Sequence, residues 1–156
     1  MKKTVLFPGT FDPFTKGHYA LLSQGLMLFD EVVLAIGHNG QKSKPFFELE
    51  KRLFFLESVA REFNGKVRVL SYEGTTIDCC KKENIQFLLR GLRNSHDFVT
   101  EQQLLFANDF LAPEIQTVFL ALPAVDQWIS ASMVRELLIY KKDVKKLLPQ
   151  ALWPYF

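Results

Sequence analysis

The sequence predicts an α/β fold in which a five-stranded parallel sheet is doubly wound, with helices on both of its faces. Short apolar runs rich in β-branched and aromatic residues alternate along the chain with amphipathic segments of helical period. The runs carry apolar residues at consecutive positions, which is typical of strands covered on both faces. In folds of this class, ligands bind beyond the carboxyl ends of the strands, where the strand order reverses.

The predicted elements follow this alternation along the whole chain. Continuous apolar runs predict strands at residues 4–7, 31–36, 66–70, 86–89 and 117–121. Apolar residues at helical spacing predict helices at residues 18–29, 49–63, 75–82, 98–111 and 130–140, with 145–148 as a candidate for a short last helix. This order is that of a Rossmann-like fold. Because no linker-like stretch interrupts it, residues 1–156 are predicted to form a single domain.

The composition disfavours several classes of function. A formal net charge of +2 gives no general basic field, so we expect small ligands and no nucleic acid, although clusters of Lys and Arg can still bind small anions. No apolar run approaches the roughly 18 residues of a membrane span, and MKKTVLFPGT reaches Pro8 and Gly9 before a signal-peptide core can form. We therefore expect a cytoplasmic protein without membrane contact, in which the adjacent Cys79 and Cys80 are buried thiols.

The stretch FPGTFDPFTKGH, residues 7–18, is the first candidate site, because it is a polar, tightly turned loop that directly follows a predicted strand. Gly9 allows the backbone to turn, and Pro13 fixes one φ angle. Thr15 is a good N-cap for a helix that starts at Lys16, which would place His18 at the third helical position. The imidazole would then lie beside the unpaired amides of the first turn.

That position suits a phosphate site, because a helix N-terminus offers free N–H groups and about half a positive charge. His18 would add a side-chain donor, and Gly17 would allow a ligand to approach closely. The plainer alternative is that His18 only caps the first turn, but the strand–loop–helix setting favours the phosphate. The loop matches neither the Walker A motif nor the G-x-G-x-x-G fingerprint, so another phosphate-binding scheme is needed.

Two further clusters follow predicted strands at the same edge of the sheet. In RGLRNSHDF, residues 90–98, two arginines flank a Gly-Leu pair, and guanidinium groups bind phosphate oxygens bidentately. In DQWISASMVRE, residues 126–136, Ser130 or Ser132 can cap a helix and present amides and hydroxyls to an anion. Plain capping and a solvated basic turn are the alternatives to a binding role.

Three motifs together resemble the bacterial phosphopantetheine adenylyltransferases. These are PGTFDPxTxGH at residues 8–18, RGLRxxxDFxxE at 90–101 and WISxSxVRE at 128–136, and the similarity spans almost the whole chain. The T-x-G-H spelling within the first motif is that of the wider nucleotidyltransferase superfamily. The resemblance implies transfer of the adenylyl group of ATP to 4′-phosphopantetheine, giving dephospho-coenzyme A and pyrophosphate. It also implies a homohexamer. Mg²⁺ should accompany the ATP, because this ion bridges phosphate oxygens.

The resemblance implies roles for individual residues. His18, Lys42 and Arg90 would be catalytic. The acceptor would be bound by Thr10, Lys42, Thr76, Arg90 and Asn108. ATP would be bound by Thr10, Phe11, His18, Gly91, Leu92, Arg93, Glu101, Asp126, Gln127, Trp128, Ile129, Ser130, Ala131 and Ser132. Three features depart from the family pattern or leave a choice open. Ala131 replaces the middle serine of I-S-S-S, the stretch at residues 74–76 that should contact the pantetheine arm differs from the common spelling, and Lys44 is a rival to Lys42 only two residues away.

The proposed chemistry explains the residue types. The attacking phosphate monoester has a second pKa of about 6 and is largely dianionic at neutral pH, so no general base is required. The need is to position two polyanions and neutralise their charge. We see no carboxylate cage for a metal, and for Asp12 we favour hydrogen bonding within its own turn over metal binding.

Three alternatives stay open from the sequence. The acceptor could instead be nicotinate mononucleotide or glycerol phosphate, since the same T-x-G-H loop would serve either. The chain could be a nucleotide-binding regulator without turnover, which the missing hydroxyl at Ala131 would permit. It could also be a structural assembly subunit, because the apolar tail at residues 151–156 is of a kind that contacts other proteins.

Overall fold

The sheet has the predicted class and topology. The computed structural model describes residues 1–38 and 44–156. Within them the chain forms a five-stranded, fully parallel sheet with the order β3-β2-β1-β4-β5. Its strands are β1 (Thr4–Gly9), β2 (Glu31–Gly37), β3 (Val67–Tyr72), β4 (Phe87–Leu92) and β5 (Gln116–Ala121). Each predicted strand overlaps an observed one, which confirms the α/β, Rossmann-like assignment.

The helices alternate with these strands. In the described part of the chain they are α1 (Lys16–Leu28), α2 (Leu49–Ala60), α3 (Thr76–Glu83), α4 (Ser95–Leu111) and α5 (Ala131–Ile139), and α2 continues into a 3-10 turn at Arg61–Phe63. Side chains of Thr15, Thr75, Asn94 and Ser130 cap four of the helix starts. None of the helices in the described residues is both long and apolar enough to cross a bilayer.

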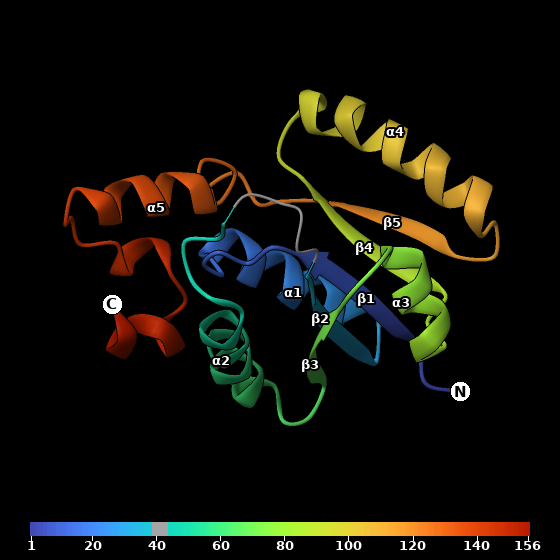
Figure 1. Ribbon diagram of the computed structural model, residues 1–156, viewed down its shortest axis with the longest axis horizontal. Coiled ribbons are helices and arrows are strands. Elements are labelled where there is room, and N and C mark those ends of the chain that lie inside the picture. Colours follow the sequence, from blue (N-terminus) through green and yellow to red (C-terminus); the bar gives the residue numbers. More distant parts are fainter. Residues whose placement is uncertain (39–43) are drawn as a thin grey trace.

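Helices cover both faces of the sheet, and each face has its own apolar core (Figure 1). Successive strand residues point to opposite faces, so Val5 and Phe7 lie in one core and Leu6 lies in the other. α1, α2 and α5 cover the first face, and α3 covers the second. Cys79 and Cys80 are buried, unpaired thiols in the second core, as predicted.

The C-terminal segment differs from the prediction. The short last helix is a 3-10 turn at Lys145–Leu147, and a second one follows at Gln150–Tyr155. Leu152 is fully buried, and the rings of Tyr155 and Phe156 lie 4.9 and 5.1 Å from those of Phe54 and Phe55 on α2. Part of this tail therefore packs against α2, while Trp153 and Tyr155 remain exposed to 36% and 40%, so contact of the tail with another protein stays a prediction.

The strand order reverses between β1 and β4, and this reversal predicts where a ligand binds. β1 pairs with β2 from Thr4 to Gly9, but it pairs with β4 only at Val5 and Leu6. Beyond Leu6 the strands diverge towards their carboxyl ends. Ligands of doubly wound folds bind at such a point.

Candidate active site

A cavity of about 920 Å³ opens where β1 and β4 diverge. It is lined by the ends of these strands, the loop of residues 10–15 (hereafter the first loop), the starts of α1 and α5, the first half of α4 and residues 44–46. Its volume is near the upper end of the range for small-molecule sites. Among the predicted site residues, the lining includes Thr10, Phe11, His18, Arg90, Gly91, Arg93, Glu101, Ile129, Ser130, Ala131 and Ser132.

The start of α1 has the predicted cap, and its geometry identifies the proton-bearing nitrogen of His18. Thr15 N donates to His18 Nδ1 over 2.9 Å, and His18 N donates to Thr15 Oγ1 over 3.5 Å, which together form a capping box. Because Nδ1 accepts a backbone hydrogen bond, it is unprotonated, and the ring proton lies on Nε2. His18 therefore caps the helix with one nitrogen and retains an N–H donor on the other.

The surroundings of His18 keep its imidazole neutral. The rings of Phe7, Phe11 and Phe14 lie 6.3, 5.1 and 5.4 Å from the imidazole, centroid to centroid. Burial, and secondly the positive charge of Arg93, lower the pKa of His18 from 6.5 to about 4. At neutral pH this side chain is an uncharged hydrogen-bond donor whose orientation is fixed by its neighbours.

Gly9 and Gly17 have roles that differ from those predicted from the sequence, which were a turn of the backbone and the close approach of a ligand. Gly9 lies within β1, and a Cβ there would meet the Phe11 ring at 2.8 Å, so its small size matters for packing rather than for a turn. In the first loop the left-handed conformation belongs to Phe11, whose φ is 47°. A Cβ on Gly17 would lie 3.3 Å from Leu122 and 3.5 Å from the Ile129 carbonyl oxygen, so this glycine also permits close packing against protein.

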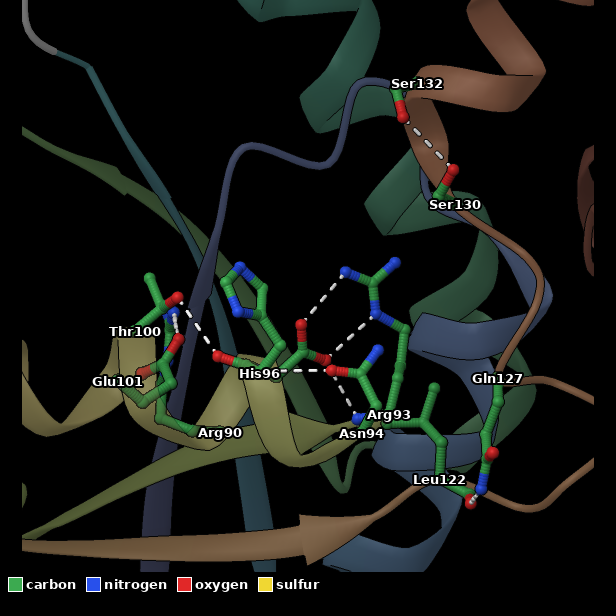
Figure 2. A network of polar contacts seen from close by, with 11 residues as sticks. Arg90, Arg93, Asn94, His96, Thr100, Glu101, Leu122, Gln127, Ser130 and Ser132 are labelled. Carbon is green, nitrogen blue, oxygen red and sulfur yellow. Dashed lines mark hydrogen bonds and ion pairs between the residues drawn. The ribbon is translucent and has the colours of Figure 1, made fainter.

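Carboxylates of α4 hold two arginines at the carboxyl end of β4, Arg90 within the strand and Arg93 directly after it (Figure 2). Arg90 forms a bidentate pair with Glu101, in which Nε donates over 2.8 Å. Arg93 donates through Nε to Asp97 over 3.1 Å, and its backbone amide donates to the same carboxylate over 2.9 Å. Each pair occupies only part of a guanidinium's five N–H donors, so donors remain for an anion.

The start of α5 forms the opposite wall of the cavity. Ser130 caps this helix by accepting from Met133 N over 3.2 Å, and the hydroxyls of Ser130 and Ser132 lie 3.1 Å apart (Figure 2). The amides of the first turn, at Ala131 and Ser132, have no intrahelical acceptor. The starts of α1 and α5 therefore bring two positive helix-dipole ends to one cavity, an arrangement that favours a polyanionic ligand.

Several predicted site residues lie elsewhere in the described structure. Outside the lining of this cavity are Leu92, Asp126, Gln127, Trp128, Thr76 and Asn108. Thr76 begins α3 at the far edge of the sheet, where its hydroxyl lies 2.9 Å from Tyr72 Oη, and Asn108 is the buried residue of α4. Lys42 lies outside the described residues. Its rival Lys44 lines the cavity and is paired with Glu48 at 3.7 Å.

The carboxylate of Asp12 has a structural role that the sequence did not reveal. It accepts hydrogen bonds from Phe46 N over 2.7 Å and from Phe47 N over 2.8 Å, so it binds a distant segment and not its own turn. Arg135, which lines the cavity and for which sequence reasoning assigned no role, donates to the carbonyl oxygen of Asp12 over 2.8 Å. No group of three or more potential metal-binding side chains occurs among the described residues.

Comparison with known proteins agrees with this arrangement. A family model described as cytidylyltransferase-like matches residues 6–137. The phosphopantetheine adenylyltransferase of Flavobacterium johnsoniae is 44% identical over 151 residues, which cover 97% of each chain. The enzyme of the same name from Cytophaga hutchinsonii is 40% identical over 96% of this chain and 98% of its own. The phosphopantetheine adenylyltransferase of Campylobacter hominis is 34% identical over 99% of this chain and 96% of its own. With the three motifs gathered at one cavity and this similarity along nearly its whole length, the chain belongs to the phosphopantetheine adenylyltransferases, within the cytidylyltransferase-like nucleotidyltransferases.

Proposed function

We propose that the protein transfers the adenylyl group of ATP to 4′-phosphopantetheine, giving dephospho-coenzyme A and pyrophosphate. The observation that carries this proposal is the convergence of the α1 and α5 starts, the Nε2–H of His18 and two arginines on one cavity. Such a site offers many donors for phosphate oxygens. It does not need a general base, because the attacking phosphate is already largely dianionic at neutral pH.

The reaction is an in-line displacement at the α-phosphorus. An oxygen of the acceptor phosphate forms the new P–O bond, and the bond from the α-phosphorus to the bridging oxygen breaks, so that pyrophosphate leaves with the electron pair. His18 Nε2 and the first-turn amides of α1 would donate to the α-phosphate oxygens as their charge changes. A preorganised donor of this kind contributes on the order of 3 kcal/mol to transition-state stabilisation.

The other polar groups divide between the two substrates. Arg90, together with Lys42, would hold the acceptor phosphate, and Thr76 and Asn108 would contact the pantetheine arm. Arg93, Glu101 and residues 126–132 would bind ATP, for which the amides at the start of α5 are suited to the β- and γ-phosphates. At Ala131 an amide would serve in place of the absent hydroxyl.

Mg²⁺ would enter as the counter-ion of ATP. Both carboxylate oxygens of Asp12 already accept backbone hydrogen bonds, so this residue does not fit a metal site. Phosphate oxygens and water would then supply the ligands, as Mg²⁺ commonly requires. Its role would be to neutralise charge on the triphosphate.

We further propose that the chain acts as one catalytic unit, assembles as a homohexamer and works in the cytoplasm. The apolar side chains exposed on α4 support self-association, with Phe106 and Phe110 exposed to 74% and 80%. The two unpaired cysteine thiols are in keeping with a reducing compartment.

An acceptor assay tests the reaction. Purified protein with ATP and Mg²⁺ should release pyrophosphate on addition of 4′-phosphopantetheine, at a rate at least 100-fold above that with nicotinate mononucleotide or glycerol phosphate. Turnover with either of these two and none with 4′-phosphopantetheine would reject the proposed acceptor. Nucleotide binding without turnover on any acceptor would instead indicate a regulator.

A further inference from the structure

Arg52 is a buried cation outside the cavity, and it hydrogen-bonds to two segments that converge on it. It lies in the first turn of α2 and is only 4% exposed. Its Nη1 donates to the carbonyl oxygen of Thr10 over 2.8 Å, and its Nε donates to the carbonyl oxygen of Phe47 over 2.9 Å. One planar guanidinium therefore joins the first loop to the segment directly before α2 (residues 45–47, hereafter the pre-α2 segment).

Asp12 joins the same two segments as a hydrogen-bond acceptor, whereas Arg52 joins them as a donor. Its carboxylate, in the first loop, accepts from the amides of Phe46 and Phe47, and the residue is also only 4% exposed. A buried anion thus binds backbone donors, and a buried cation binds backbone acceptors. Burial lowers the pKa of Arg52, and the negative charges of Asp12 and Glu48 oppose that shift.

The hydrogen bonds of Arg52 and Asp12 fix the positions of two walls of the cavity. Thr10, Asp12 and Phe46 line the cavity, whereas Arg52 does not. Asp12 is further held by Arg135 of α5, which donates to its carbonyl oxygen over 2.8 Å. The first loop is consequently fixed against α2 and α5 together, by hydrogen bonds that span 34 to 123 residues of sequence.

Burying two charged groups is costly, and apolar residues of similar volume often stabilise a fold as well or better. A guanidinium offers what an apolar side chain cannot, namely several donors in a rigid plane that fix two carbonyl groups relative to each other. Catalysis that depends on positioning is sensitive to small displacements, because a shift of about 1 Å can cost about 100-fold in rate.

We propose that Arg52, together with Asp12, is a positioning pair that fixes the first loop against the pre-α2 segment and thereby sets the catalytic geometry of the cavity. Arg52 acts through Thr10 and Phe47 and does not touch the substrates. The expected effect of Arg52 on kcat rests on the proposed function. Its effect on the position of the first loop can be measured without turnover.

The kinetic test compares Arg52→Ala and Arg52→Lys with Arg61→Ala, which removes an exposed arginine from the 3-10 turn that follows α2. For Arg52→Ala we expect kcat to fall about 100-fold while KM for either substrate changes less than about fivefold. Arg52→Lys should lose less, and millimolar methylguanidinium should restore part of the kcat of Arg52→Ala but not raise that of Arg61→Ala. An unchanged kcat in Arg52→Ala, with only a lower melting temperature, would show a merely structural role and overturn the proposal.

The second readout is hydrogen exchange at Phe46 and Phe47, whose amides bond to Asp12 and not to Arg52. If the pair acts as a unit, these amides should exchange at least tenfold faster in Arg52→Ala, while amides in the centre of α2 keep their wild-type rates. If the amides of Phe46 and Phe47 exchange at wild-type rates in Arg52→Ala, the proposed coupling between Arg52 and Asp12 is wrong. Because this measurement needs no acceptor, a wild-type protein inactive with 4′-phosphopantetheine would reject the proposed function and leave this inference to be judged by exchange alone.

Discussion

At the scale of single residues, His18 has one fixed tautomer, which suits the role proposed for it as a donor to phosphate oxygens. Its Nδ1 accepts from the Thr15 amide, which holds the ring and leaves the proton on Nε2. Since its pKa is lowered to about 4, the side chain remains a neutral donor across the range in which a phosphate monoester loses its second proton, near pH 6. In the proposed reaction, the charge of the attacking phosphate would therefore change without a change in the protonation of His18.

We predict that His18 does not titrate in the folded protein between pH 5.5 and 8. For a histidine with a lowered folded pKa, the unfolded state binds more protons between the two pKa values, so stability falls as pH drops from 6.5 towards 4. The loss amounts to at most about 3 kcal/mol at low pH. NMR titration of the imidazole resonances measures the pKa directly, with the exposed His38 and His96 as internal controls. A midpoint for His18 near 6.5 would contradict the prediction.

The site residues differ in how far the sequence could reveal them. Thr15 and His18 are three residues apart, and their capping box follows from local helix geometry, so it was predictable. The side chains of Asp12 and Arg52 find partners 34 to 42 residues away, and no local pattern marks them. An arginine in an amphipathic helix is ordinarily expected to be exposed, so the burial of Arg52 is revealed only by the folded structure.

At the scale of elements, strand cores were easier to predict than element ends. Each strand carries enough consecutive apolar residues to be recognised, but its end depends on pairing with a neighbour, and β1 extends to Gly9 through its ladder with β2. α4 begins three residues before its predicted start, because Asn94 accepts from Asp97 N over 3.0 Å. Asp97, which pairs with Arg93, therefore lies in the first turn of α4.

Glu31 links three strands at the amino ends of the sheet. Starting from β2, its carboxylate accepts from Lys2 over 3.0 Å and from Thr4 of β1 over 3.1 Å, and it lies 3.4 Å from Arg68 of β3. Burial alone would raise its pKa, but the hydrogen bonds from Lys2 and Thr4 and the charges of Arg68 and Lys2 outweigh it, so the pKa is lowered.

We predict that Glu31→Gln lowers the free energy of unfolding at pH 7 by about 1–2 kcal/mol, because a carboxylate with several partners is lost. A lowered folded pKa means that this contribution is present above the unfolded pKa of 4.5 and disappears as the pH falls through the folded pKa. Urea denaturation at pH 7 and pH 3 should show the gap to wild type closing at the lower pH. The exposed Glu114→Gln, which removes the same charge, serves as the control. A gap that stays constant from pH 7 to pH 3 would show that ionisation of Glu31 is not involved.

At the scale of the whole molecule, α4 exposes more large apolar side chains than any other described helix, and the C-terminal tail also exposes Trp153 and Tyr155. Val99, Phe106 and Phe110 form one stripe along this helix and are exposed to 60, 74 and 80%. α4 runs along β4 and β5 at one side of the sheet (Figure 1), and within the helix only Asn108 is buried. Apolar side chains in such a stripe usually mark a protein interface. The hexamer implied by the resemblance would therefore use this helix.

We predict that Phe106→Glu and Phe110→Glu break up the assembly. An unpaired carboxylate inside an apolar interface costs several kcal/mol in each copy, and the lost aromatic contact adds to it. Light scattering should give wild type a mass about six times the 18.0 kDa of one chain, and the variants a smaller species that keeps its circular dichroism spectrum. Met27→Glu introduces the same charge at a position on α1 that is 84% exposed, and it should leave the mass unchanged. A monomeric wild type would contradict the hexamer itself. If wild type and both α4 variants share one larger mass, the subunits must meet through a different surface of the molecule.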